Sequence, residues 1–159
     1  MNKIHRKVEY ALIALKHMSQ KKPGQLTTVK EVCGLYGCPF DATSRVLQIL
    51  VQKGLLKSEQ GAHGGYLILK DLSKMTMFDL IESIVGPLGV VRCLDSDTST
   101  TCEMLDSCNV SQPLKLLNSR LSDFYRGITV ESLFSPHKKA SLESSEIATK
   151  GFRPEDQRL

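Results

Sequence analysis

No stretch of this 159-residue chain approaches the roughly 18 consecutive apolar residues that a membrane-spanning helix needs. The amino terminus, MNKIHRKVEY, is charged and lacks the apolar segment of a secretion signal. The sequence also lacks a phosphate-binding glycine loop, a Ser-His-Asp arrangement and paired carboxylates in a recognisable setting. We therefore expect a cytoplasmic protein that is neither attached to a membrane nor an enzyme.

Cysteine is present, but not in the pattern of a disulfide framework. The chain has five cysteines, an odd number, and no export signal, so its thiols are expected to stay free for metal or redox chemistry. Cys33 lies on the apolar face of a predicted helix and Cys38 lies beside a turn. We expect both to be buried structural thiols rather than a pair of metal ligands. The chemistry is therefore expected at the other three cysteines.

Charge divides the chain into a basic half and an acidic half. Residues 1–75 contain twelve Lys or Arg and five Asp or Glu, whereas residues 76–134 contain four and eight. A basic segment is typical of DNA-binding domains, because lysine and arginine neutralise phosphates irrespective of base sequence. An acidic second half argues against a protein that packages DNA along its whole length.

Turn and capping signals divide the first half into helices. Apolar residues at helical spacing predict a first helix that ends before Lys22-Pro23-Gly24. Thr28 and Glu31 form a capping-box pattern that predicts a second, short helix ending at Gly37. A second helix followed by a tight turn is the first half of a helix-turn-helix unit.

A third helix follows, with Asp41 as its expected N-cap and Gly54 as its end. In a helix-turn-helix unit this helix presents its amino-terminal turn and outer face to base edges. The candidate DNA-reading residues are Asp41, Ala42, Thr43, Ser44, Arg45 and Gln48.

A glycine-rich hairpin is predicted after the third helix. Leu55-Leu56 and the alternating run Tyr66–Leu69 flank SEQGAHGG, which predicts two strands joined by a tip that can approach DNA closely. The remaining DNA-binding candidates, from this wing and from the start of the second helix, are Thr28, Gln60, His63, Gly64 and Gly65.

The second half is predicted to contain two longer helices around a polar loop. Thr76 and Asp79 form a capping pattern for a helix that ends at Gly86-Pro87. Beyond the loop, apolar residues step by three and four and form a seam suited to a partner helix. The seam residues are Leu114, Leu117, Leu121, Phe124 and Ile128. We expect this helix to mediate dimerisation; packing on its own domain is the alternative.

The polar loop RCLDSDTSTTCEMLDSCNV contains Cys93, Cys102 and Cys108. Thiolates select zinc, copper(I) or iron-sulfur clusters. Structural zinc sites usually use Cys-x2-4-Cys pairs, which this loop lacks, so zinc is disfavoured. A helix starting near Ser111 would direct its positive end toward an anionic site.

These features together resemble the IscR/NsrR family of winged-helix, iron-sulfur transcriptional regulators. The resemblance covers about residues 3–134 and rests on VEYALIAL, TTVKEVCGLYGC, RVLQILVQKGLLKS, GAHGGYLILKD and MTMFDLIESIVGPL, followed by the three cysteines. It implies a homodimeric repressor or activator, of which we favour the repressor, that binds a double-stranded DNA operator. It also implies a 2Fe-2S or 4Fe-4S cluster that senses redox state, nitric oxide or the iron supply.

The resemblance further implies a fourth cluster ligand outside the cysteine loop. Some members have a histidine after the third cysteine, but this chain has Asn109-Val110-Ser111-Gln112 there. Others use an acidic residue of the first helix, to which Glu9 corresponds, so the expected metal ligands are Cys93, Cys102, Cys108 and Glu9. The chain departs from the family in a longer gap between the first two cysteines, and in Gln60 and His63 of the wing.

The fold expected is mainly α with a small β-wing, in three parts. These are a winged helix-turn-helix DNA-binding domain (residues 1–75), a linking helix, cysteine loop and dimerisation helix (76–134), and a disordered tail (135–159). A different function also stays open, in which two cysteines of the loop form a disulfide and no metal binds. The chain would then be a metal-free thiol redox switch that controls transcription.

Overall fold

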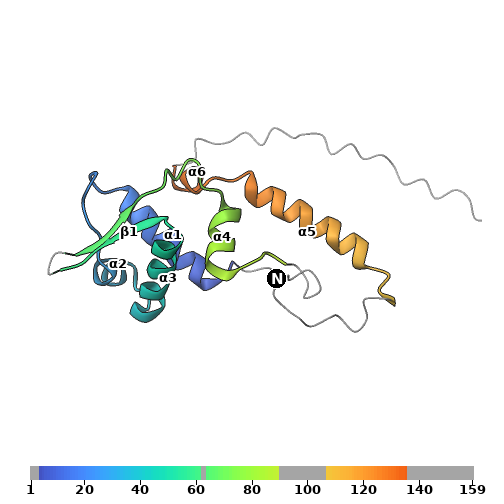
Figure 1. Cartoon of the computed structure of the whole chain (residues 1–159), viewed down its shortest axis with the longest axis horizontal. Coiled ribbons are helices and arrows are strands. Elements are labelled where there is room, and N and C mark those ends of the chain that lie inside the picture. Colours follow the sequence, from blue (N-terminus) through green and yellow to red (C-terminus); the bar gives the residue numbers. More distant parts are fainter. Residues whose placement is uncertain (1–3, 62–63, 90–106, 136–159) are drawn as a thin grey trace, which may run out of the picture.

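The structure, a computed structural model, describes residues 4–61, 64–89 and 107–135, and within them the chain is mainly helical with one small antiparallel sheet (Figure 1). This confirms the expected fold class. The elements are α1 (Arg6–Ser19), α2 (Val29–Tyr36), α3 (Phe40–Gln52), β1 (Leu56–Glu59), β2 (Gly65–Ile68), α4 (Met77–Val85), α5 (Ser111–Arg126) and α6 (Val130–Phe134). Cys93, Cys102, His63 and nearly all of the predicted tail lie outside the described residues.

The second helix begins and ends where the sequence predicts. The Thr28 hydroxyl accepts a hydrogen bond from the Glu31 amide at 3.1 Å, and Gly37 ends the helix in the left-handed region with φ 66°. The predicted capping box is only half formed. The Glu31 carboxylate binds His17 Nε2 of α1 at 2.8 Å and Lys21 Nζ at 2.7 Å instead. Glu31 therefore ties α2 to the first helix.

The third helix starts two residues earlier than predicted, and Asp41 is not its N-cap. Pro39 is the N-cap, with extended backbone and no side-chain capping bond. A proline fixes φ near the value found at helix starts and has no N–H to lose, so it can begin a helix without a polar side chain. Asp41 lies in the first turn, where its negative charge faces the positive end of the helix.

The two strands form the predicted hairpin, and their base is joined to the helix-turn-helix unit. Leu56 pairs with Ile68 and Glu59 with Gly65. A further bridge joins Thr27 to Tyr66, where the two residues exchange backbone hydrogen bonds of 2.9 and 3.0 Å. We call β1, β2 and the residues between them the wing. Its orientation relative to α2 is set by the Thr27 bridge.

Apolar side chains of α1, α2, α3, β1 and α4 form one core. Leu15, Leu47, Leu50, Leu56 and Leu80 are among its fully buried members. At the start of α4 the predicted capping box is complete, because the Thr76 hydroxyl accepts from the Asp79 amide while the Asp79 carboxylate accepts from the Thr76 amide. Through this core, α4 packs directly against α1 and α3 of the helix-turn-helix domain.

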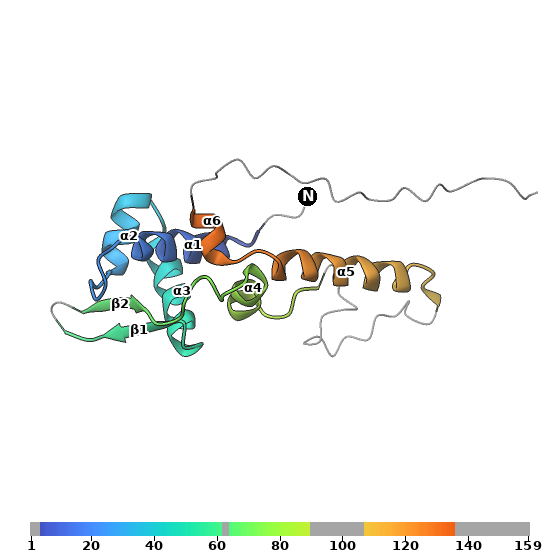
Figure 2. The same ribbon diagram turned by 90° about the horizontal axis from the view of Figure 1, so that it is seen from above.

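Helix α5 has its amino end far from the winged-helix body and runs toward it, so that its carboxyl end is joined to the body (Figures 1 and 2). There the Met77 amide donates to the Ile128 carbonyl at 2.8 Å, and the Val130 amide donates to the Met75 carbonyl at 2.8 Å. The Glu131 amide adds a 3.2 Å bond to the Leu72 carbonyl. We call this pairing of residues 72–77 with residues 128–131 the clasp. It joins the end of α5 to the segment between the wing and α4.

The predicted seam of α5 is divided between two surroundings. Leu114 and Leu121 are half-buried, whereas Leu117 and Phe124 are 49% and 62% exposed. Ile128 lies beyond the helix, in the clasp. Among the described helices, none is long and apolar enough to cross a membrane.

Candidate nucleic-acid interface

The outer face of α3 carries a row of accessible polar side chains. Asp41, Arg45 and Gln48 are exposed, and Ala42 and Ser44 are partly exposed. These residues occupy the first turns of the helix and the face that points away from the core. Arginine and glutamine both have the donor geometry to read base edges, arginine at guanine and glutamine at adenine.

Thr43 does not share this face, contrary to the expectation from the sequence. Its side chain is fully buried, and its hydroxyl has no hydrogen-bond partner. Thr43 lies three and four residues before the buried Val46 and Leu47, so helical periodicity directs it inward with them. Its position indicates packing rather than base reading.

A groove of about 400 Å³ separates the outer face of α3 from the wing. Its walls are polar on both sides, with Gln48 and Gln52 from α3 and Ser58 and Gln60 from the wing. Gln52, one turn after Gln48, was not among the predicted residues, although its spacing by four was a usable signal. The groove thus lies between the recognition helix and the wing, the two elements with which a winged helix contacts DNA.

The wing glycines are needed by the protein's own backbone. A Cβ added to Gly65 would lie 2.8 Å from the Thr27 carbonyl oxygen, and one added to Gly64 would lie 2.3 Å from the Glu59 carbonyl oxygen. Both distances are shorter than a real Cβ contact. Close approach to the Thr27 segment explains Gly65, and close approach to the backbone of the wing itself explains Gly64, without reference to DNA.

Most basic side chains of the first half are exposed, but three have acidic partners. Arg6 pairs with Glu9 at 3.3 Å and Lys57 with Glu59 at 3.2 Å. Lys21 is only 12% exposed and is held by Glu31. Thr28 is exposed, although its hydroxyl is occupied by helix capping. Near α3 and the wing, Arg45, Lys53 and Lys70 form no ion pair among the described residues, so they are available as phosphate partners.

Of the four expected metal ligands, two lie within the described residues. Cys108 is half-buried immediately before α5, and its carbonyl oxygen accepts a bond from the Ser111 hydroxyl at 3.3 Å. Glu9 lies on α1 with its side chain 43% exposed, paired with Arg6. No three His, Cys, Asp or Glu side chains of the described residues are grouped to hold a metal ion.

The cysteines of the helix-turn-helix unit have the surroundings of structural thiols. Cys38 is buried and Cys33 is half-buried against the core. Burial, with a smaller effect from the neighbouring Cys33 thiol, raises the pKa of Cys38 above its ordinary value. A thiol that resists ionisation is a poor nucleophile and a poor metal ligand.

Residues 4–136 match the Rrf2 family, described as "Iron-dependent Transcriptional regulator". The chain belongs to the Rrf2 family. It is accordingly a transcriptional regulator with a DNA-binding winged helix, and members of this family are regulators rather than enzymes.

Individual relatives and solved structures agree with the Rrf2 assignment. A provisionally named HTH-type transcriptional regulator of Aquifex aeolicus (strain VF5) is 27% identical, over 83% of this chain and 91% of that protein. The structure of CymR, the global cysteine regulator of B. subtilis, has a TM-score of 0.64 at 22% identity and covers 84% of this chain and 97% of that one. T. potens IscR has a TM-score of 0.58 at 17% identity, with coverage of 83% and 85%. These two structures show the shared fold.

Proposed function

We propose that this Rrf2 regulator binds a double-stranded DNA operator as a homodimer and represses transcription under the control of an iron-sulfur cluster. Cys93, Cys102 and Cys108 of one subunit would supply three ligands. Glu9 of the other subunit would supply the fourth. The observation that carries the proposal is the continuity from Cys108 through α5 to the clasp, and from there to the wing. Such continuity gives a change at the cysteines a physical route to the DNA-reading elements.

The donor set fits the group. Three thiolates and one carboxylate are soft and hard donors that iron accepts together, and the half-buried Cys108 stands before the positive end of a 16-residue helix. When bound, the cluster supplies a redox-active, iron-containing group that oxidants, nitric oxide or shortage of iron can alter. The protein's own part is to hold the thiolates at one end of α5 while the other end stays fastened by the clasp.

Release of Glu9 offers a second route to the reading unit. Glu9 lies in the first turn of α1, and the same helix contributes Val8, Ala11 and Leu15 to the core beside α3. When Glu9 is not a ligand, its carboxylate has Arg6 as a partner at 3.3 Å. A carboxylate that exchanges between iron and an arginine can shift α1 relative to α3.

DNA contact is proposed for two surfaces. Arg45 and Gln48 of α3 would read bases in the major groove, with Asp41, Ala42 and Ser44 beside them, and Gln60 with Gly64 and Gly65 of the wing would approach the neighbouring backbone. Thr28 and His63 are proposed as flanking contacts. Dimerisation is proposed through Leu117 and Phe124, which a partner helix would cover.

The test is anaerobic purification followed by visible absorption spectroscopy and analysis for iron and sulfide. Wild type is compared with Cys93→Ser, Cys102→Ser and Cys108→Ser, and Cys33→Ser serves as the matched control outside the loop. We expect broad thiolate-to-iron absorption in wild type and Cys33→Ser and its loss in the other three. Glu9→Ala is expected to keep iron less tightly than an exposed control, Glu131→Ala.

A colourless wild type without iron after reconstitution would overturn the cluster. If two loop cysteines then form a disulfide on oxidation and DNA binding changes with it, the metal-free thiol switch takes its place. Operators selected from random DNA with the anaerobic and with the iron-free protein establish which form binds. Arg45→Ala is expected to weaken the selected site by about 1–3 kcal/mol and to relax preference at one base pair.

A further inference from the structure

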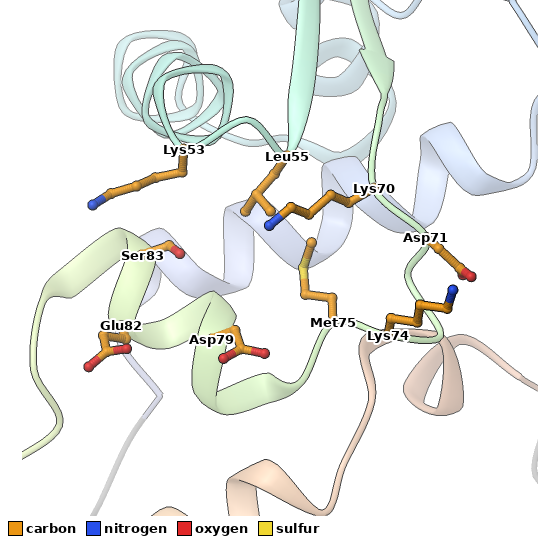
Figure 3. Close-up of a pocket in the computed structure, with 9 residues that line it drawn as sticks. All are labelled: Lys53, Leu55, Lys70, Asp71, Lys74, Met75, Asp79, Glu82 and Ser83. Carbon is orange, nitrogen blue, oxygen red and sulfur yellow. The ribbon is translucent and has the colours of Figure 1, made fainter.

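A second cleft lies between the end of α3, the base of the wing and α4 (Figure 3). Its volume is about 540 Å³, which is within the range of roughly 300 to 1,000 Å³ typical of small-molecule sites. Leu55 and Met75 line it and are almost fully buried, so they provide an apolar floor. The cleft shares no lining residue with the groove between α3 and the wing.

None of the three lysines that line this cleft forms an ion pair among the described residues. Lys53, the residue that ends α3, and Lys70, just after β2, both line it, and Figure 3 shows Lys70 extending beside Leu55. Among the described residues, no Asp or Glu oxygen lies within 4.0 Å of either ammonium nitrogen. Both charges are thus available to an anion.

The acidic residues at the cleft are mostly engaged elsewhere. Asp71 accepts hydrogen bonds from the Ser73 amide and hydroxyl at 3.0 and 2.7 Å, and Asp79 accepts from the Thr76 hydroxyl at 2.7 Å. Lys74 lies on the Asp71 side of the cleft and lowers the pKa of that carboxyl, after the stronger effect of the Ser73 hydrogen bonds. Glu82 remains, with its side chain exposed on α4. Three lysines and three carboxylates line the cleft, so its formal charge is balanced. Lys74 lies beside Asp71, so the ammonium groups available to an anion are those of Lys53 and Lys70.

We propose that this cleft binds a small organic anion with a short apolar body. Its carboxylate or phosphate lies between Lys53 and Lys70, its apolar part rests on Leu55 and Met75, and the Ser83 hydroxyl is the nearest neutral donor on α4. Charge-assisted hydrogen bonds to lysine favour such an anion over a neutral molecule of the same shape. The site is separate from the cysteine loop and needs no metal.

The position of the cleft gives the anion a regulatory effect. Its walls come from α3, which carries the DNA-reading face, and from α4, which packs against α5. An anion held by both walls fixes the angle between α3 and α4. It therefore favours one orientation of α3 relative to DNA. This effect rests on the proposed DNA-binding function, whereas binding of the anion itself does not.

The experiment is a titration of the full chain, carrying labelled leucine and methionine methyl groups, followed by nuclear magnetic resonance. Phenyl phosphate is the probe, with phenol and inorganic phosphate as its apolar and anionic halves. We expect phenyl phosphate to shift the Leu55 and Met75 methyl signals at lower concentration than either half. In the double variant Lys53→Gln/Lys70→Gln its dissociation constant is expected to rise about tenfold or more.

The matched control is Lys16→Gln/Lys30→Gln, which removes two exposed lysines of α1 and α2 and is expected to leave the titration unchanged. Unmoved Leu55 and Met75 signals, or equal affinity in both double variants, would overturn the proposal. If Lys53→Gln/Lys70→Gln instead weakens binding to all DNA sequences and lowers its salt dependence while the methyl signals stay still, the two lysines are DNA phosphate contacts. None of these readouts depends on iron, so a failure here is distinct from a failure of the cluster.

Discussion

At the scale of single residues, Glu31 connects the first two helices through charge. Its carboxylate accepts from Lys21 and from His17, and His17 Nδ1 lies 3.0 Å from the Tyr36 hydroxyl. Burial by itself raises the pKa of Glu31, but the hydrogen bonds from Lys21 and His17 outweigh it, and the net pKa lies below the ordinary 4.5. The ionised form is therefore the one that the folded chain prefers.

We predict that Glu31→Gln lowers the free energy of unfolding at pH 7 by about 1 kcal/mol, a value reduced for partial exposure. Because the pKa is lower in the folded than in the unfolded chain, this stabilisation is present above the unfolded pKa. It is lost as the pH falls through the folded pKa. Urea denaturation of wild type and variant at pH 7 and pH 3 measures the difference. Glu131→Gln, on an exposed side chain, is the control, and a gap that does not narrow at pH 3 would contradict the assignment.

Substitution by alanine is expected to change the stability of the protein in opposite directions at two glycines, Gly65 and Gly34. Gly65→Ala places a methyl group against the Thr27 carbonyl, so we expect a loss of about 1–3 kcal/mol in the free energy of unfolding. Gly34→Ala lies within α2 with no atom within 4 Å of the added Cβ, and a gain of up to about 1 kcal/mol is expected from helix propensity. Urea denaturation of both variants tests the pair. Equal losses at the two sites would show that the Thr27 contact is not responsible.

At the scale of elements, the clasp decides how α5 is attached to the reading unit. The clasp has two side-chain contacts besides its backbone hydrogen bonds. Val130 is fully buried against the core, and the Arg126 guanidinium lies 3.8 Å from the centre of the Phe78 ring. These contacts bring the end of α5 to the start of α4. The clasp is thus the structural link on which the proposed signalling route depends.

Val130→Ala is predicted to lower the free energy of unfolding by about 1–3 kcal/mol, because it removes buried methyl groups. It is also predicted to reduce the effect of the cluster on DNA affinity, measured as the ratio of operator dissociation constants with and without iron. Leu133→Ala, an exposed position of the same helix α6, is the control for both measurements. An unchanged ratio in a folded, destabilised Val130→Ala protein would remove the clasp from the signalling route.

At the scale of the whole molecule, one side of α5 is left uncovered. Leu117 and Phe124, seven residues apart, are exposed on it, while the opposite edge of the helix carries Lys115, Ser119 and Arg126. An exposed apolar stripe on a long helix is typical of a protein-protein interface. The proposed second copy of the chain would cover this stripe.

We predict that Leu117→Glu/Phe124→Glu converts the protein to a monomer in analytical ultracentrifugation, since it adds two like charges at the centre of the proposed interface. Binding to a two-fold symmetric operator is expected to weaken by at least about tenfold, because the two reading heads no longer bind together. Ser119→Glu, on the polar edge, should leave the dimer intact. A dimer that persists in the double variant would place the interface elsewhere.

Local signals in the sequence were sufficient for most elements. Capping by Thr28, the complete box of Thr76 and Asp79, and the left-handed Gly37 all depend on a few neighbouring residues, and each is found where expected. The exposed candidates on α3 followed from its periodicity in the same way. Thr43 was misplaced because its polarity was weighed above its position beside Val46 and Leu47 in the helical repeat.

The sequence by itself therefore determined the order of the elements from α1 to α5, including the wing, and the resemblance to IscR/NsrR regulators, because helix caps, turns and apolar periodicity are encoded within a few residues. It did not predict α6. The tertiary structure alone decided which distant residues meet. It paired Glu31 with His17, joined residues 72–77 to residues 128–131, and brought Lys53 and Lys70 to one cleft. Such contacts depend on how whole elements pack around the shared core, and no local pattern specifies that packing.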